Sequence, residues 1–184
     1  MLRHLRIAAT ILCWPMDPAL AQDTPEAAAQ AFGEAMKAND WAAAARMMHP
    51  RALQQLRSLF EPILGVPGAE QLGAQLFGVH SNAGLASTPD TVMFANFLRT
   101  VLSQQEGLAD ALRTATVSPL GHVNSGADTV LVVSRMELTI EGMTISQFEV
   151  MPFIRDGGRW WGLLKVDFTN MAAMLQRRLG ARRS

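Results

Sequence analysis

The chain has 184 residues, with 16 basic and 16 acidic side chains and a formal net charge of zero. Because no basic surplus is present, we expect no nucleic-acid partner. The chain contains one cysteine, Cys13, and no tyrosine. One cysteine excludes an internal disulfide, so a hydrophobic core has to stabilise the fold.

Residues 1–21 have the pattern of a secretory signal peptide. Two arginines precede the apolar run IAATILCW, and Ala19 to Ala21 form a small-x-small cleavage site. That run is too short to cross a bilayer and no second long run follows, so we expect no membrane span in the mature chain. The alternative is an apolar N-terminal helix of the folded domain. We predict export to the periplasm or the medium, with residues 22–184 as a single domain.

Residues 24–110 have the periodicity of helices. Thr24 is a predicted N-cap with Pro25 at the first helical position, and Asp40 is predicted to cap a second helix, WAAAARMM. The run RALQQLRSLFEPIL predicts a third helix, and a shorter segment follows around Leu72 and Leu76.

The strongest helix pattern follows the predicted loop GVHSNAGLA. Thr88 is the predicted N-cap, and Pro89 occupies the first turn. Apolar residues then recur with the spacing of one helix face, at Phe94, Phe97, Leu98, Val101 and Leu102. We therefore expect this helix to bury one side.

After Leu112 the hydrophobic period changes from 3.6 to 2. We predict antiparallel strands within residues 114–168, formed by ATVSPLGHV, DTVLVVSRMELTI, MTISQFEVMPFI and RWWGLLKVDF, and a C-terminal helix over 169–180. The predicted fold class is α+β, with N-terminal helices packed on a curved antiparallel sheet.

Two predicted three-residue turns, Glu141–Met143 and Asp156–Gly158, set the predicted register of the last three strands. This register pairs Phe148 with both Met136 and Val166, and Val150 with Leu164, on one apolar face. The other face is half ionic and half apolar, with Arg135, Glu149, Lys165, Asp167, Met151, Phe153, Trp161 and Leu163.

The half-ionic face allows two interpretations. It can be a solvated outer face whose opposite charges pair at up to ~1 kcal/mol each, with its apolar half as a contact patch. It can instead line a pocket in which Glu149, flanked by two cations and close to Asp167, performs acid-base chemistry. The alternation of side chains leaves both interpretations open.

The order of elements is helices, the segment KANDWAAAARMMHPRA, and a meander whose last strand follows DGGRWW. This order resembles the nuclear transport factor two-like superfamily of cone-shaped α+β domains, and in particular its exported bacterial members without an assigned activity. The resemblance covers the mature chain except for about residues 52–110, where the helical segment is enlarged. It implies a pocket between helices and sheet, and dimerisation through the sheet.

The resemblance does not supply a catalytic set. The isomerases and the dehydratase of that superfamily use tyrosines, and this chain has none. Its epoxide hydrolases use an Asp, Arg and Asp arrangement, for which only Arg135 and Asp167 are available here. An activity carried over from the fold would therefore be analogy alone.

Histidine and methionine give no clear metal site. His49, before a proline, is expected to cap or pack at a helix end, and His80 and His122 have no ligand-type neighbours at metal-binding spacing. The two methionine clusters fit core packing. We expect no metal and no cofactor.

The leading hypothesis is an exported, non-catalytic domain that binds a small apolar molecule or a partner protein between helices and sheet, with a possible homodimer through the sheet. Its predicted ligand-binding residues are Phe94, Phe97, Met136, Phe148, Val150 and Leu164, and its predicted interface residues are Met151, Phe153, Trp161 and Leu163. The alternative is a lyase, isomerase or hydrolase acting on a hydrophobic molecule. In that case Asp167 or Glu149 is the base, and Arg135 or Lys165 stabilises negative charge.

Overall fold

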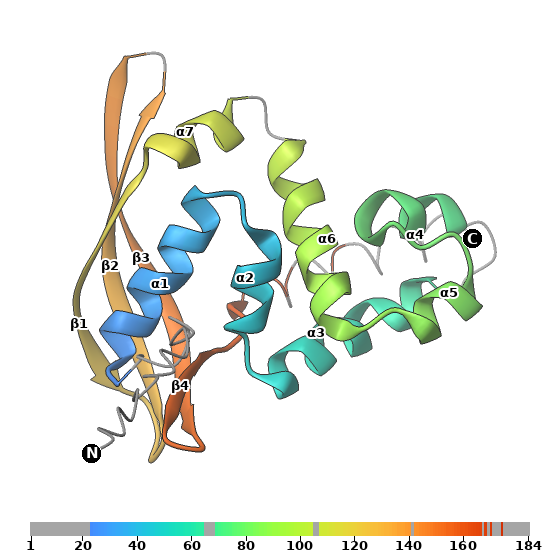
Figure 1. Cartoon of the computed structure of the whole chain (residues 1–184), viewed down its shortest axis with the longest axis horizontal. Helices are drawn as coiled ribbons and strands as arrows, with labels where there is room; N and C mark the ends of the chain where they lie inside the picture. The colour runs from blue at the N-terminus through green and yellow to red at the C-terminus, as the bar shows by residue number, and fades with distance from the viewer. Residues whose placement is uncertain are drawn as a thin grey trace, which may run out of the picture.

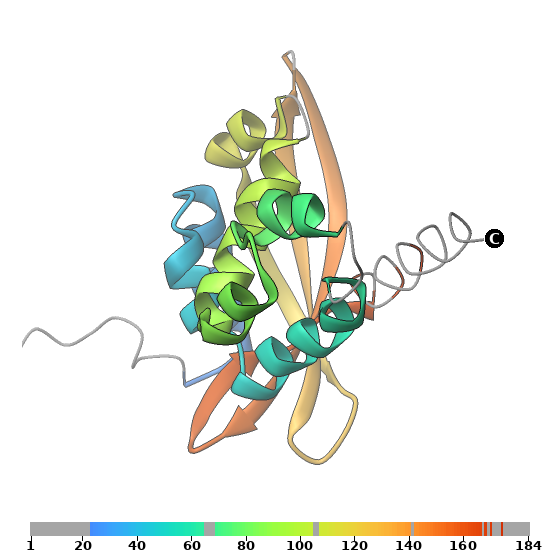
Figure 2. The same cartoon turned by 90° about the vertical axis from the view of Figure 1, so that its right-hand side faces the viewer.

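The computed structural model describes residues 23–64, 69–104, 107–140 and 142–166, together with residues 168, 170 and 174. The predicted signal peptide, and most of the predicted helix over 169–180, lie outside the described residues. The predicted α+β class is confirmed, because helices from the N-terminal side pack on one open, antiparallel, four-stranded sheet. Figure 1 shows these helices on one side of the sheet, and Figure 2 shows them in front of it after a 90° turn.

The helical part starts with the two caps that the sequence predicts. Thr24 Oγ1 accepts a hydrogen bond from Ala27 N at 3.2 Å, and Asp40 Oδ1 accepts one from Ala43 N at 2.8 Å. The helices are α1 (Pro25–Lys37), α2 (Trp41–Arg46), α3 (Pro50–Leu64), α4 (Glu70–Phe77), α5 (Asn82–Ser87), α6 (Asp90–Ser103) and α7 (Leu108–Thr114). None of the helices in the described part of the chain is long and apolar enough to cross a membrane.

The segment before α6 differs from its prediction. The predicted loop contains α5, whose N-cap Ser81 accepts a hydrogen bond from Gly84 N at 3.0 Å. Pro89, not Thr88, is the N-cap of α6. The Thr88 hydroxyl instead donates to Gly84 O at 2.7 Å, so it closes the end of α5. The predicted cap is wrong because the preceding helix takes the hydroxyl.

Aromatic rings form the centre of the helical core. Phe60 lies 5.2 Å from Phe77 and 5.5 Å from Phe97 between ring centroids, and Phe77 lies 5.7 Å from Phe97. All three are fully buried. Helix α6 buries Phe94, Phe97 and Leu98, so the prediction that it buries one side is confirmed.

The sheet is the predicted meander, with strand order β1-β2-β3-β4. Its strands are β1 (Thr116–Asn124), β2 (Thr129–Ile140), β3 (Met143–Asp156) and β4 (Arg159–Gly162). Strand β4 is much shorter than predicted. It ends where Gly162 N donates to Met47 O and Gly162 O accepts from His49 N, both at 2.9 Å. Gly162 thus also pairs with the link between α2 and α3, while the next residue, Leu163, keeps one hydrogen bond to β3, from its N to Pro152 O at 2.8 Å.

The predicted register is wrong by one residue in both hairpins. Met136 pairs with Gln147 instead of Phe148, and Phe153 pairs with Gly162 instead of Trp161. Each turn therefore has two residues between the paired strands. In the second turn Gly157 and Gly158 have φ values of 58° and 78°, and a two-residue hairpin turn of this kind requires positive φ at both positions.

The corrected register redistributes the side chains between the faces of the sheet, because a one-residue slip turns a side chain to the opposite face. Even-numbered residues of β2 and odd-numbered residues of β3 now share the face that packs on the helices, as Met136 and Gln147 show. Phe148 is 70% exposed on the other face, where no described helix lies. We call this second face the outer face.

A side-chain hydrogen bond connects α1 to β1. Glu26 Oε1 and His122 Nδ1 lie 2.5 Å apart, and this hydrogen bond holds the pKa of Glu26 below its ordinary value of 4.5. A lowered folded-state pKa stabilises the fold above pH ~4.5, and this contribution is lost as the pH falls through the lowered value.

His122→Ala is therefore expected to lower the free energy of unfolding by up to ~1 kcal/mol at neutral pH, and by less as the solution is acidified below pH ~4.5. Urea unfolding at a series of pH values measures the difference. His80→Ala, at an exposed position, is the control. A His122→Ala effect that does not change with pH would contradict the assignment.

Candidate ligand-binding cavity

A cavity of about 420 Å³ lies between the sheet and helices α1, α6 and α7. We call it the α1–sheet cavity. Its volume falls in the range of small-molecule sites in proteins. Much of its wall is apolar, with Phe32, Met36, Leu112, Val117, Met136 and Met151 among the lining residues.

Close packing of α1 on β1 closes one side of this cavity. A Cβ atom on Gly33 would lie 3.1 Å from Cβ of Val117, which is tighter than ordinary van der Waals contact. Glycine at this position therefore lets the helix approach the strand closely. One helical turn on each side, Ala29 and Lys37 also line the cavity, so this face of α1 forms its long wall.

Ser134 adds a hydroxyl-bearing residue to the lining of the α1–sheet cavity. Ser134, at the centre of β2, is 6% exposed and pairs with Glu149 on β3. Its hydroxyl has no hydrogen-bond partner among the residues that the structure describes. A hydroxyl on the cavity lining without a protein partner is a group with which a bound molecule can form a hydrogen bond.

The charged residues of the cavity lie on its rim. Lys165 Nζ donates a short hydrogen bond to Glu149 Oε2, and Gln147 Nε2 donates to Glu149 Oε1 at 3.3 Å. The two charged side chains are 30% and 36% exposed, respectively. Lys37, at the end of α1, is the third charged residue of the lining. The lining therefore contains a carboxylate paired with Lys165 and a second ammonium, that of Lys37, which has no ion-pair partner among the described residues.

The structure brings together two members of the predicted catalytic set. Glu149 and Lys165 form an ion pair in the α1–sheet cavity. Arg135 pairs in register with Phe148 and is exposed on the outer face, so it does not reach that pair. Asp167 lies outside the described residues. Glu149 can accept a proton or a hydrogen bond here, and Lys165 can donate one, without a third group from the predicted set.

The predicted ligand-binding residues lie in three places. Met136 lines the α1–sheet cavity. Phe94 and Phe97 are buried in the helical core, and Leu164 packs at the edge of that core. The other two, Phe148 and Val150, are exposed on the outer face, because the register differs from the predicted one.

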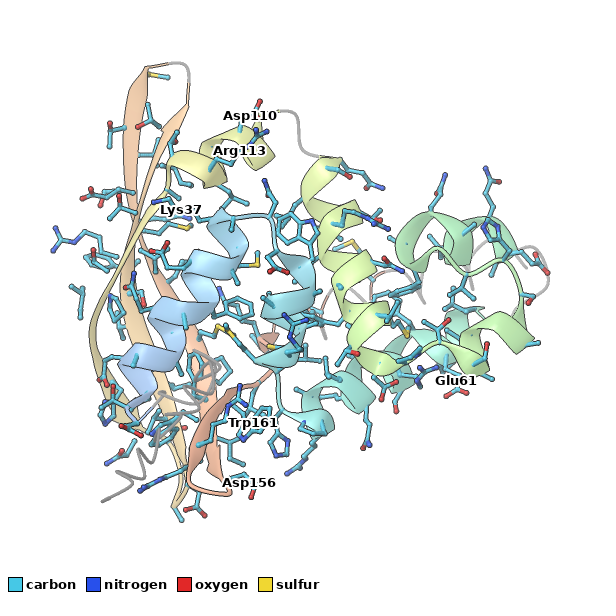
Figure 3. The ribbon with its side chains drawn as sticks, viewed as in Figure 1. Lys37, Glu61, Asp110, Arg113, Asp156 and Trp161 are labelled. Atoms are coloured by element: carbon cyan, nitrogen blue, oxygen red, sulfur yellow. The ribbon has the colours of Figure 1, made fainter. Side chains whose placement is uncertain are left out.

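The predicted interface residues lie in or against the core. Phe153 is fully buried, Met151 lines the cavity, and Leu163 packs against the helical core. Trp161 is half-buried, and its indole N–H donates to Asp156 O at 3.2 Å. Figure 3 shows Trp161 and Asp156 together at the lower end of the sheet. These four residues therefore do not form an exposed contact patch.

The site residues that the sequence analysis missed come from α1 and β2. Phe32 and Met36 fall on one helix face by their spacing alone, but the spacing does not tell which strand they face. The predicted register does not pair Ser134 with Glu149, because it places these two residues on opposite faces of the sheet. The adjacent glycines at 157 and 158 are the signal that favours a two-residue turn and the correct faces.

His49 has structural partners in the described part of the chain. Nδ1 of His49 accepts a hydrogen bond from Arg51 N at 3.1 Å, and its Nε2 lies 3.2 Å from Asp156 Oδ2. The prediction that His49 caps a helix end is thus confirmed. Within the described ranges, no three His, Cys, Asp or Glu side chains gather in a group that could hold a metal ion.

Neither a protein-family model nor a curated protein nor a solved structure matches the chain. The resemblance to the nuclear transport factor two-like superfamily stays a prediction. The functional argument consequently depends on the geometry of the α1–sheet cavity.

Proposed function

We propose that the protein is an exported domain that binds a small, mainly apolar molecule in the α1–sheet cavity. The observation that carries the proposal is a cavity of about 420 Å³ with a largely apolar wall, which the hydroxyl-bearing residue Ser134 also lines. Export is supported by the signal-peptide pattern of residues 1–21. N-terminal sequencing of the protein from the periplasmic or medium fraction is expected to start at Gln22. Absence of the protein from both fractions would contradict export, and a start at Met1 would contradict cleavage of a signal peptide.

Binding is favoured over catalysis by the state of Glu149, the one carboxylate in the described part of the lining. Glu149 is already neutralised by Lys165 and accepts a second hydrogen bond from Gln147. A general base has to be within hydrogen-bond reach of the proton that it removes, and a third group usually orients it. Arg135 cannot take that role from the outer face. The enzyme hypothesis therefore keeps Glu149 as its base but has no complete set of partners among the described residues.

The proposal predicts that a large side chain at residue 136 blocks binding. Met136→Trp places a bulky ring in the cavity lining, so we expect affinity for the fluorescent apolar probe N-phenyl-1-naphthylamine to fall about tenfold or more. A probe titration of the purified mature chain measures the change. Thermal unfolding monitors whether the variant keeps its fold.

Val150→Trp is the matched control, because it adds the same ring to the outer face. We expect it to bind the probe like the parent protein. Equal probe affinities for the two folded variants would place binding elsewhere and contradict the proposal.

We also infer that two copies of the chain pair through the outer face. Val123, Phe148 and Val150 are exposed there, and large exposed apolar groups of this kind mark interaction sites. Arg135 and Glu137 lie two residues apart on the outer side of β2. A twofold axis through this face would let Arg135 of each copy meet Glu137 of the other, which makes the surface complementary to itself.

Phe148→Glu is expected to shift the protein from dimer to monomer, because it places a charge in the apolar part of that interface. Light scattering after size exclusion measures the mass of each species. Thr144→Glu, on the same strand and face but next to the β2–β3 turn and paired with Thr139 instead of Glu137, is the control. A parent protein that is monomeric at high concentration would rule out this pairing.

A further inference from the structure

Both lysines of the chain line the α1–sheet cavity. Apart from Lys37 and Lys165, every basic residue that is counted in the charge of the sequence is an arginine. Lys165 is neutralised by Glu149. Lys37 has no hydrogen-bond or ion-pair partner among the residues that the structure describes. Among the described residues, the lining of the cavity therefore carries one positive charge that no carboxylate pairs with.

The Lys37 ammonium and the apolar side chains line the same cavity. Lys37 is the last residue of α1, next to Met36 and one turn after Gly33, which packs against Val117 of β1. Figure 3 shows Lys37 at this end of α1, beside the sheet. A molecule in the cavity can therefore contact apolar side chains along its length and a cation at one end.

We propose that the ligand is an amphipathic carboxylate. This inference depends on the proposed function of the cavity. The hydrocarbon part lies along the apolar wall, and the carboxylate is held by Lys37, whose ammonium acts as a point charge for an anion. A ligand with one negative charge balances the lining, whereas a cationic amphiphile would bring a second positive charge to Lys37.

The test compares three molecules that share an alkyl chain and differ in the head group: decanoate, decanol and decylamine. Each is used to displace N-phenyl-1-naphthylamine from the mature protein at neutral pH and low salt. We expect decanoate to bind about tenfold more tightly than decanol, and decylamine to bind most weakly. Equal affinity for decanoate and decanol overturns the inference while leaving the proposed apolar site intact. If neither the probe nor any of the three binds, the proposed function itself fails.

The variant Lys37→Gln tests whether Lys37 causes the preference for decanoate over decanol. We expect this variant to lose the preference for decanoate and to keep the affinity for decanol. Arg113→Gln is the control, because it removes a positive charge from the exposed surface of α7, outside the cavity lining. An equal loss of preference in both variants would show that general charge attracts decanoate, which overturns the role of Lys37.

Lysine acylation provides a second readout that does not depend on a variant. Decanoate is expected to protect Lys37 of the parent protein from acetic anhydride, as followed by mass spectrometry of peptides, whereas decanol is expected to leave its rate of acetylation unchanged. Equal rates at Lys37 with and without saturating decanoate would contradict contact between the carboxylate and this lysine.

Discussion

Phe97→Ala is expected to lower the free energy of unfolding by about 3–5 kcal/mol, the largest effect of any single change considered in this protein. Phe97 is 1% exposed, and its ring lies within 5.7 Å of the rings of Phe60, Phe77 and Phe168, centroid to centroid. Truncation removes apolar contacts on several sides and leaves a void between helices that relaxes only in part.

Urea unfolding followed by circular dichroism measures this loss. Val92→Ala is the control, because Val92 lies on the same helix and is 46% exposed. We expect its effect to stay within about 0.5 kcal/mol. A similar small effect for Phe97→Ala would contradict a helical core centred on these rings.

Arg57→Met is expected to cost about 2–3 kcal/mol of unfolding free energy, the second-largest effect. Arg57 connects α3 to the segment before α6 through three acceptors. Its Nε lies 2.5 Å from Asp90 Oδ1, its Nη1 donates to Leu85 O at 2.7 Å, and its Nη2 donates to Thr88 O. Both charged side chains are mostly buried, so removing the guanidinium leaves Asp90 and two carbonyl groups without this donor.

The same unfolding measurement distinguishes the effect of the three guanidinium hydrogen bonds from the effect of the positive charge. Arg57→Lys keeps the charge but cannot reach three acceptors in one plane, so we expect an intermediate loss. Arg51→Met, at an exposed position of α3, is the matched control and is expected to change stability by less than about 0.5 kcal/mol. Equal effects of Arg57→Met and Arg51→Met would show that the three hydrogen bonds of Arg57 do not stabilise the attachment of residues 85–90 to α3.

Local sequence signals predict much of this fold. The caps Thr24 and Asp40 are confirmed, because each acts on a backbone N–H only three residues away. The apolar spacing of α6 is confirmed by the burial of Phe94 and Phe97. The meander is also confirmed, since alternation and glycine-containing turns are local features.

Features that depend on distant segments were not predictable in this way. The early end of β4 results from backbone hydrogen bonds to Met47 and His49, more than a hundred residues earlier in the chain. The Thr88 hydroxyl has two possible uses within a few residues, and only the presence of α5 decides between them. Each of these outcomes depends on contacts that hydrophobic periodicity does not contain.

The predicted register is the main reason that the sequence analysis missed the candidate site. A turn of two residues instead of three moves Phe148 away from the helix side and moves Glu149 beside Ser134 on that side. Each face of the sheet therefore contains residues from both predicted faces, the apolar one and the half-ionic one. Helix α1 supplies the opposite wall with Phe32 and Met36, and sequence spacing does not identify its partner strand.

Methionine methyl NMR tests the central claim, that the α1–sheet cavity is the binding site, most directly. Met36, Met136 and Met151 line the cavity, Met93 is buried in the helical core, and Met143 is exposed at the β2–β3 turn. In protein labelled with carbon-13 at the methionine methyl groups, we expect saturating N-phenyl-1-naphthylamine to shift the signals of the first three and to leave Met93 and Met143 unchanged. Unchanged cavity methyls at saturation, or shifts confined to Met93 or Met143, would contradict the claim.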